Sequence, residues 1–116
     1  MSAPLVDHGP RDLNIHTLIG PDGCAVTVVG DVDGAAAPRL RECLLALLDR
    51  PEATDVELDL TGVTFLGSAG LTTLVIAHQR AERTGRVFKV RCDTSRAVLR
   101  PLGITGLSTV LTIVNP

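Results

Sequence analysis

The strongest constraint on the fold is a regular alternation between short apolar segments and two longer segments with helical spacing. Residues 36–49 and 69–83 carry apolar side chains three or four positions apart, as amphipathic helices do. Short strand-like segments precede them at 25–29 and 56–60, and another follows at 87–92. Because strands joined through helices are usually parallel neighbours, the pattern predicts an α/β fold.

The two ends of the chain complete this predicted sheet. A strand at 13–19 is followed by the turn signal Pro21-Asp22-Gly23, so the first two strands should form a hairpin. A last edge strand is expected at 110–114. The hairpin makes the sheet mixed, and the whole pattern predicts one domain with a mixed sheet of about four to five strands and packed helices.

Glycine and proline residues set the expected limits of these elements. We expect residues 30–34 to break the second strand and residues 61–67 to form a loop. Thr94 or Ser95 should cap a short helix that ends near Leu102, because Pro101 and Gly103 prevent its extension. The side chains expected to point inward from the second long helix are Leu71, Leu74, Val75, His78 and Ala81.

Composition and charge exclude several classes of function. With 45% hydrophobic and 21% charged residues the chain is globular; residues 1–11 read as a flexible leader and residues 12–116 as the domain. Eleven basic against thirteen acidic residues argue against nucleic-acid binding. No segment is apolar enough for a membrane span or signal peptide, which predicts a cytoplasmic protein. The three cysteines, Cys24, Cys43 and Cys92, read as buried thiols, and no metal or other cofactor is expected.

The segment VTFLGSAGLTTL places Ser68 between small residues at an expected junction of strand and helix. A hydrolase elbow would need glycine where Leu66 stands, and His78 is ten positions along the following helix. A phosphate-binding loop would need a nearby lysine, whereas Lys89 is the single lysine of the chain. Two interpretations remain: Ser68 is an ordinary helix N-cap, or its unshielded hydroxyl is the target of a kinase.

The segment from Leu58 to Leu71, LDLTGVTFLGSAGL, resembles the signature of the STAS domain family of anti-sigma factor antagonists, D-L-x-x-V-x-F-x-D-S-x-G-L. The segment Gly30-Asp31-Val32-Asp33 is similar to the G-E-L-D turn of that family, and the segment 102–107 is similar to its L-x-x-x-G-L ending. The resemblance covers nearly all of residues 13–114 and implies a single STAS-like domain.

The resemblance implies a binding protein and not an enzyme. Members of the family capture an anti-sigma factor that is a serine kinase, so that a sigma factor is released. Phosphorylation at the position of Ser68 ends the capture, and a serine phosphatase restores it. The residues expected to contact the partner are Asp31, Asp33, Leu66, Gly67, Ser68, Ala69, Leu71 and Thr72.

Several roles stay open at this point. The family usually has aspartate where this chain has Gly67, so the alternative is an adaptor or ligand-sensing module that is not phosphorylated. Asp33 equally suits a cap of the following helix. Asp59 is expected to accept hydrogen bonds from residues 62–67. Thr72 and Thr73 are secondary candidates for phosphorylation.

Overall fold

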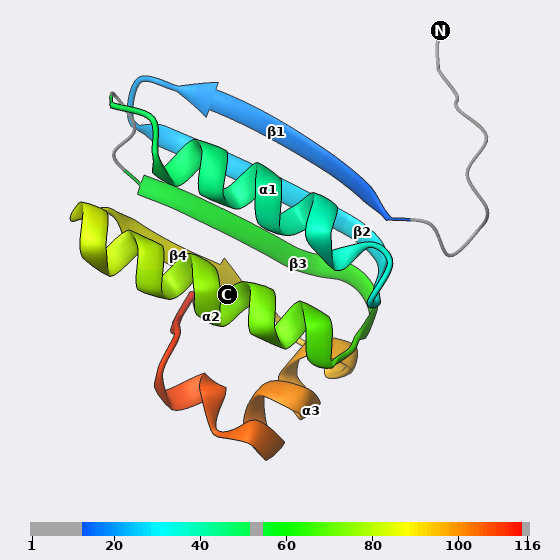
Figure 1. Cartoon of the computed structure of the whole chain (residues 1–116). Helices are drawn as coiled ribbons and strands as arrows, with labels where there is room; N and C mark the ends of the chain where they lie inside the picture. The colour runs from blue at the N-terminus through cyan, green and yellow to red at the C-terminus, as the bar shows by residue number, and fades with distance from the viewer. Residues whose placement is uncertain (1–12, 52–54, 115–116) are drawn as a thin grey trace, which may run out of the picture.

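A five-stranded sheet forms the centre of the fold, and its strands lie side by side in chain order (Figure 1). The computed structural model describes residues 13–51 and 55–114. β1 is antiparallel to β2, and every later pair is parallel, so the predicted mixed α/β sheet is confirmed. The elements are, in chain order, β1 (Asn14–Gly20), β2 (Gly23–Val32), α1 (Ala37–Leu48), β3 (Asp55–Leu66), α2 (Ser68–Thr84), β4 (Val87–Arg91), α3 (Arg96–Thr105), the 3₁₀ helix η1 (Leu107–Thr109) and β5 (Thr112–Val114).

The helices α1 and α2 lie side by side across one face of the sheet (Figure 1). Their apolar faces and the facing side chains of β2, β3 and β4 form an aliphatic core, which includes Leu40, Leu44, Leu58 and Leu74. The buried face of α2 differs from the predicted one, because the small residues of the helix lie closest to the sheet. Its buried residues are Gly70, Thr73, Leu74, Ala77 and Ala81, whereas Leu71, Val75 and His78 are only partly buried.

Both central strands are longer than the sequence suggested. β2 continues to Val32, so the break predicted at 30–34 begins only at Asp33. β3 continues to Leu66, so the predicted loop at 61–67 is wrong except at Gly67. The pairing steps from Thr27 to Val29 on β2 while β3 advances from Asp59 to Gly62, and a second extra residue of β3 lies opposite the step from Gly30 to Asp31. Each bulge leaves one residue of β3 outside the ladder of hydrogen bonds. β3 therefore continues to pair with β2 beyond Gly62.

The helix α3 passes through Pro101 and ends at Thr105, beyond the predicted end near Leu102. Pro101 stands inside the helix, and the left-handed Gly106 (φ 77°) is the residue that terminates it. Ser95 occupies the N-cap position, as one of the two predicted candidates, although its side chain makes no capping hydrogen bond. The edge strand β5 pairs with β4 as expected.

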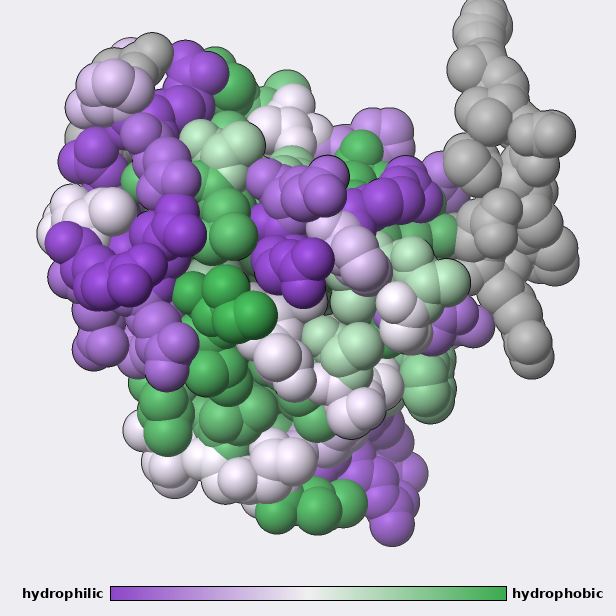
Figure 2. All heavy atoms as spheres, in the orientation of Figure 1, coloured by the Kyte–Doolittle hydropathy of each residue, from purple (hydrophilic) through white to green (hydrophobic). Residues whose placement is uncertain are grey.

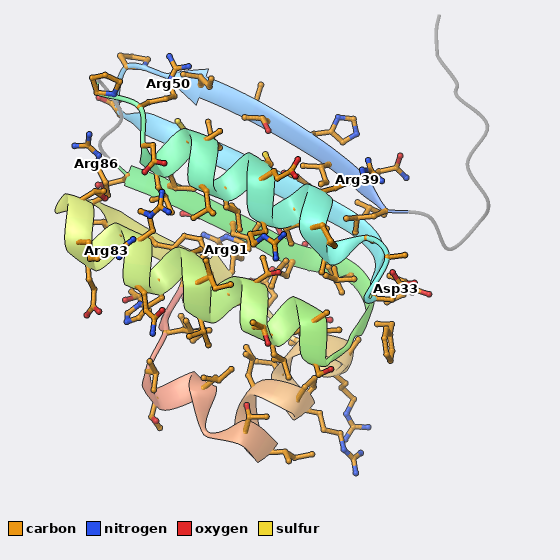
Figure 3. All side chains as sticks on the ribbon, viewed as in Figure 1. Asp33, Arg39, Arg50, Arg83, Arg86 and Arg91 are labelled. Carbon is orange, nitrogen blue, oxygen red and sulfur yellow. The ribbon has the colours of Figure 1, made fainter. Side chains whose placement is uncertain are left out.

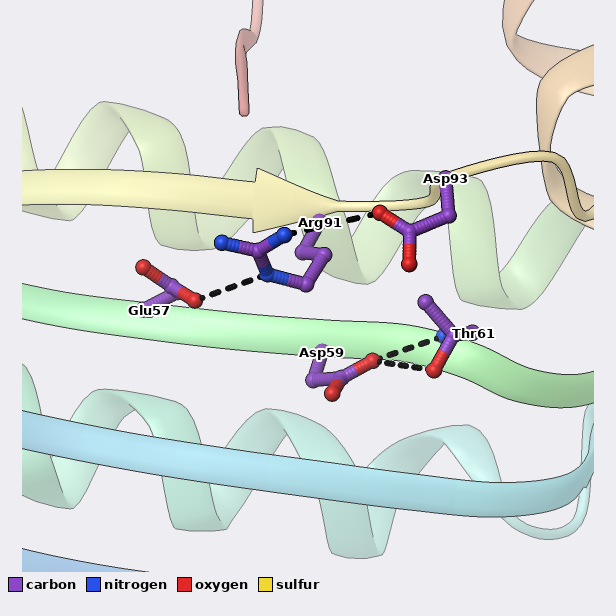
Figure 4. A network of polar contacts seen from close by, with 5 residues as sticks. All are labelled: Glu57, Asp59, Thr61, Arg91 and Asp93. Carbon is purple, nitrogen blue, oxygen red and sulfur yellow. Dashed lines mark hydrogen bonds and ion pairs between the residues drawn. The ribbon is translucent and has the colours of Figure 1, made fainter. Parts of the chain in front are cut away.

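The face of the sheet opposite α1 and α2 carries a polar network (Figure 4). Arg91 on β4 donates from Nε to Oε2 of Glu57 on β3 at 3.1 Å, and its Nη1 lies 3.5 Å from Oδ1 of Asp93. The hydrogen bond to Glu57 is the main reason that the pKa of Arg91 is raised. The network therefore ties the two neighbouring strands together on their polar side.

Some expectations concern residues that the structure does not describe. The predicted leader, residues 1–11, lies outside the described residues. Among those that are described, no helix is both long and apolar enough to cross a membrane. Cys24 and Cys92 are buried free thiols as predicted, whereas Cys43 is only partly buried and lies 3.5 Å from the Thr17 hydroxyl.

Candidate functional site around Ser68

The candidate site lies where β2 and β3 end and the helices α1 and α2 begin (Figure 1). Parallel strands direct their carboxyl ends to the same edge of a sheet, so the residues following both strands meet there. The backbone amide of Gly67 donates to the carbonyl of Val32 at 3.1 Å, which joins the two segments. The segments 31–34 and 64–70 therefore form one continuous surface.

Ser68 is the first residue of α2, and its side chain is exposed. The interpretation in which Ser68 is the N-cap is contradicted, because Gly67 holds that position with φ −87° and ψ −176°. The carbonyl of Gly67 accepts the first bond of the helix, from the amide of Leu71 at 3.0 Å. The Ser68 hydroxyl makes no hydrogen bond to any described residue.

Close packing against β2 and β3 is the reason that position 70 is a glycine. Leaving the neighbouring Ser68 unshielded is not the reason. A Cβ atom at Gly70 would lie 2.6 Å from Cδ1 of Leu66 and 2.8 Å from Cγ1 of Val32, which is closer than real contacts allow. The first turn of α2 thus rests directly on the ends of β2 and β3. This contact fixes the position of Ser68 relative to the sheet.

Both predicted aspartates of the β2 end lie on this surface, and each has a structural partner. Asp33 accepts at Oδ1 from the amides of Ala35 and Ala36 at 3.1 and 2.9 Å, which fixes the turn before α1. The N-cap itself is Ala36, without a side-chain cap bond, so the prediction that Asp33 caps α1 is wrong. Asp31 accepts at Oδ1 from the Thr64 hydroxyl at 2.5 Å. Both carboxylates keep oxygen atoms near the surface while they fix the turn and the end of β3.

Asp59 supports the chain differently from the prediction. Its Oδ1 accepts from the backbone amide and the hydroxyl of Thr61, at 2.9 and 2.7 Å, and not from residues 62–67 (Figure 4). These bonds lie at the first bulge of β3, opposite Thr27. Asp59 therefore stabilises the bulge that precedes the site.

The remaining predicted contact residues differ in their accessibility. Leu66 is buried, and Ala69 and Leu71 are half-buried against the core. Thr72 is exposed, and its hydroxyl donates to the Ser68 carbonyl at 3.0 Å. Thr73 is 2% exposed and donates to the Ala69 carbonyl, so its burial argues against its prediction as a phosphorylation candidate.

Sequence reasoning missed Phe65 as a residue of this surface. Its side chain is 50% exposed, whereas Phe88, the other aromatic residue, is buried. Period-two alternation from the buried Leu58 and Leu60 places Phe65 on the outward side, and the two one-residue bulges together preserve that side. The signal was missed because residues 61–67 were expected to form a loop. The bulge opposite Gly30 and Asp31 is visible only in the register of the strands.

Three arginines lie at the opposite end of the molecule. Arg50, Arg83 and Arg86 lie together where α1 and α2 end (Figure 3), and this end is the most hydrophilic part of the view in Figure 2. The Arg86 guanidinium donates from Nη2 to the carbonyl of Arg50 at 2.8 Å. By contrast, the segments 31–34 and 62–70 contain two aspartates and no lysine or arginine. These two segments are therefore acidic, whereas Arg39 of α1 lies at the same end of the molecule and donates to the Leu13 carbonyl (Figure 3).

Other chemistry is not assembled around Ser68. His78 lies farther along α2, with Nε2 3.6 Å from Oε2 of Glu82, which is the carboxylate partner expected for a half-buried helix histidine. Among the described residues no group of three or more histidine, cysteine or acidic side chains could hold a metal ion. A shallow hollow beside the β1–β2 hairpin, lined by Leu18, Gly23 and Lys89 among others, does not include Ser68.

The arrangement matches known proteins over nearly its whole length. A family model described as the STAS domain matches residues 13–115. The chain is 26% identical over 102 residues to an anti-sigma-B factor antagonist from Bacillus subtilis (strain 168), with 88% of this chain and 91% of that protein covered.

Solved structures show the same fold. The crystal structure of an anti-sigma factor antagonist from Mycobacterium paratuberculosis has a TM-score of 0.80 and 26% identity, covering 90% of this chain and 87% of that chain. The anti-sigma factor antagonist SpoIIAA in its unphosphorylated form has a TM-score of 0.74 and 12% identity, with 90% and 88% covered. The phosphorylated form of the Bacillus cell fate determinant SpoIIAA has a TM-score of 0.69 and 11% identity, with 90% and 91% covered.

Proposed function

The chain belongs to the STAS domain family, and from this premise we propose that it is an anti-sigma factor antagonist switched by phosphorylation of Ser68. In this proposal the unphosphorylated protein captures an anti-sigma factor serine kinase in the cytoplasm, and the captured kinase releases its sigma factor. Phosphorylation of Ser68 ends the capture, and a serine phosphatase restores it. The protein itself acts by binding and not by catalysis. The observation that carries the proposal is the exposed Ser68 hydroxyl, which has no hydrogen-bond partner among the described residues.

The local backbone favours phosphorylation without unfolding. A phosphate on Ser68 would lie at the N-terminus of the 17-residue helix α2, where the helix dipole and free amides stabilise an anion. Close packing at Gly70 holds this end of the helix against the sheet. SpoIIAA structures of the phosphorylated and unphosphorylated forms both match this fold, which supports a switch that leaves the fold unchanged.

The charge of the surface explains how a phosphate would end the capture. A phosphoserine adds about 1.5 to 2 negative charges near neutral pH. The surface already carries Asp31 and Asp33, and its two segments offer no basic side chain as a partner for the new group. Burying the phosphate in an interface would therefore require costly desolvation. A penalty of about 3 to 4 kcal/mol weakens binding by a few hundred-fold or more.

The alternative is an adaptor that is not phosphorylated, or a ligand-sensing module. Gly67 motivates it, since a carboxylate is usual in the family at this position and is missing here. Direct phosphorylation separates this alternative from the switch. The purified anti-sigma factor serine kinases encoded in the source organism are incubated one by one with the protein, Mg²⁺ and ATP, and the product is read by intact mass and peptide mapping.

We expect one phosphate on Ser68 with the cognate kinase, and none on Ser68→Ala. In binding measurements with the same kinase and ADP, Ser68→Ala should bind as tightly as the unmodified protein, and Ser68→Asp should bind at least about a hundred-fold more weakly. Ser108→Asp is the matched control, because Ser108 is an exposed serine on η1 and should bind normally. Unchanged binding by Ser68→Asp would refute the switch, and modification of Thr72 instead would refute Ser68 as the acceptor.

A further inference from the structure

Phe65 exposes half of an aromatic side chain three residues before Ser68. A single exposed apolar residue is common on protein surfaces and carries no meaning by itself. Phe65 differs because its ring has a defined position on the surface. It lies on β3 opposite Asp31, and the hydrogen bond between Thr64 and Asp31 fixes the backbone beside it.

The ring of Phe65 lies directly against the backbone of Gly67. A Cβ atom at Gly67 would be 2.9 Å from Cε2 and 3.2 Å from Cζ of the ring. Any side chain at position 67 must therefore push the ring away from this place. The φ of −87° at Gly67 is open to any residue, so the backbone conformation does not require glycine. The contact with the ring is the feature of this structure that favours glycine there.

We infer that Phe65 is an aromatic anchor for the partner. Gly67 is the positioning residue, because its missing side chain leaves room for the ring beside Ser68. This inference rests on the proposed function, because the partner is the same anti-sigma factor kinase. Aromatic side chains in the centre of an interface often account for much of its affinity, since they bury a large area with few rotatable bonds. In this chain an aromatic contact occupies the place of the carboxylate that is usual in the family before the serine.

The chemistry of the surface defines what the partner must present. The ring requires an apolar recess, and the neighbouring carboxylates of Asp31 and Asp33 favour basic groups at the rim of that recess. The Ser68 hydroxyl lies within the same surface. A phosphate on Ser68 would then face the partner at the edge of its apolar contact, where it is least easily solvated.

A double-mutant cycle tests the inference with the cognate kinase and ADP, measured by calorimetry. Phe65→Ala should weaken binding by at least about tenfold. Gly67→Ala should weaken it by a smaller factor, because the new methyl group displaces the ring but does not remove it. In the Phe65→Ala background Gly67→Ala should have no further effect, since no ring remains to be displaced.

Two further variants make the result specific. Ile19→Ala removes a side chain of similar exposure (52%) at the far end of the sheet and should bind like the unmodified protein. Phe65→Leu keeps apolar volume, is expected to fold if Phe65→Ala does not, and should give an intermediate affinity. Circular dichroism spectra and melting curves establish that each variant is folded before binding is measured.

The outcomes separate this inference from the proposed function. If the unmodified protein binds no anti-sigma factor kinase of its organism, both are refuted. If it binds and Phe65→Ala binds equally well, the anchor is refuted and the proposed function stands. If the losses from Phe65→Ala and Gly67→Ala simply add, Gly67 does not act through the ring, and that part of the inference is wrong.

Discussion

Gly70 shows how a single missing methyl group determines the geometry of the site. In an exposed helix, replacing glycine by alanine is favourable by up to about 1 kcal/mol. At Gly70 the added methyl group would overlap Leu66 and Val32, and overpacking of a core usually costs about 1 to 3 kcal/mol. The packing term is larger, so glycine is favoured at this position despite its low helix propensity.

We therefore predict that Gly70→Ala lowers the free energy of unfolding by about 1 to 2 kcal/mol in urea denaturation. Gly103→Ala is the control, because a Cβ atom there has no neighbour within 4 Å and Gly103 lies inside α3. The control should be neutral or more stable by up to about 1 kcal/mol. Equal behaviour of the two variants would show that the contact at Gly70 is not tight.

At the same scale, Asp33 combines a structural role with a candidate binding role. Asp33→Ala removes the acceptor for the amides of Ala35 and Ala36 and should cost about 1 kcal/mol of stability. Asp33→Asn keeps an acceptor oxygen but loses the charge, so it should retain stability and weaken binding to a basic partner face. Unfolding curves and affinities of both variants separate the roles. If Asp33→Asn binds normally, the charge has no part in recognition.

At the scale of elements, the sequence predicts helices better than strand ends. The apolar spacing placed α1 and α2 to within one or two residues, because each buries one continuous stripe. The continuation of β3 to Leu66 could not be predicted, since two bulges break the alternation on which strand assignment depends. The exposure of Phe65 was missed because residues 61–67 were expected to form a loop. Pro101 made the predicted helix too short, since α3 was expected to end near Leu102. The burial of Val98 and Leu102 maintains the helix past this proline.

The bulge at Asp59 offers a test at this scale. Asp59→Ala removes both hydrogen bonds to Thr61, which hold the first bulge of β3, and should reduce stability by about 1 kcal/mol. Faster amide hydrogen exchange should appear in β3 between Thr61 and Leu66, while α1 remains protected. Asp93→Asn is the control, because Asp93 makes a longer contact of 3.5 Å in the same polar network and asparagine tolerates its left-handed backbone (φ 49°). Unchanged exchange in β3 would contradict the support role.

For the whole molecule, the opening hairpin and the parallel pairing of the later strands followed from the alternation of elements, whereas the orientation of α2 did not. The aliphatic composition explains both results. Leu, Val and Ala fill the core in many ways, so the pattern identifies which segments are buried but not which small residues allow the closest approach. Thr73 and Ala77 are buried for this reason, although neither was expected to point inward.

The buried thiol of Cys92 predicts how stability depends on alkaline pH. Burial raises the pKa of Cys92 from 9.0 to about 11, so the folded state holds its proton more tightly than the unfolded state. Stability should be complete below pH 9 and fall by about 1 to 2 kcal/mol as the pH rises to 11. The chain contains no tyrosine and one lysine, so few other groups titrate in this range.

Urea unfolding at pH 8, 9, 10 and 11 measures this dependence, with the pH values chosen around the shift of Cys92. Cys92→Ala should flatten the curve even though it lowers stability at every pH. Cys43→Ala is the control, because it removes a thiol that is only partly buried, and the loss of stability toward pH 11 should persist in this variant. A flat profile for the unmodified protein would show that Cys92 does not govern it.

The half-exposed ring beside Ser68 also has an optical consequence. The chain contains no tryptophan or tyrosine, so it has almost no intrinsic fluorescence of its own. Phe65→Trp would introduce a lone fluorophore next to the serine against a dark background. The wavelength of its emission maximum would then report, in real time and without labels, whether this surface is exposed to water, covered by a partner or phosphorylated.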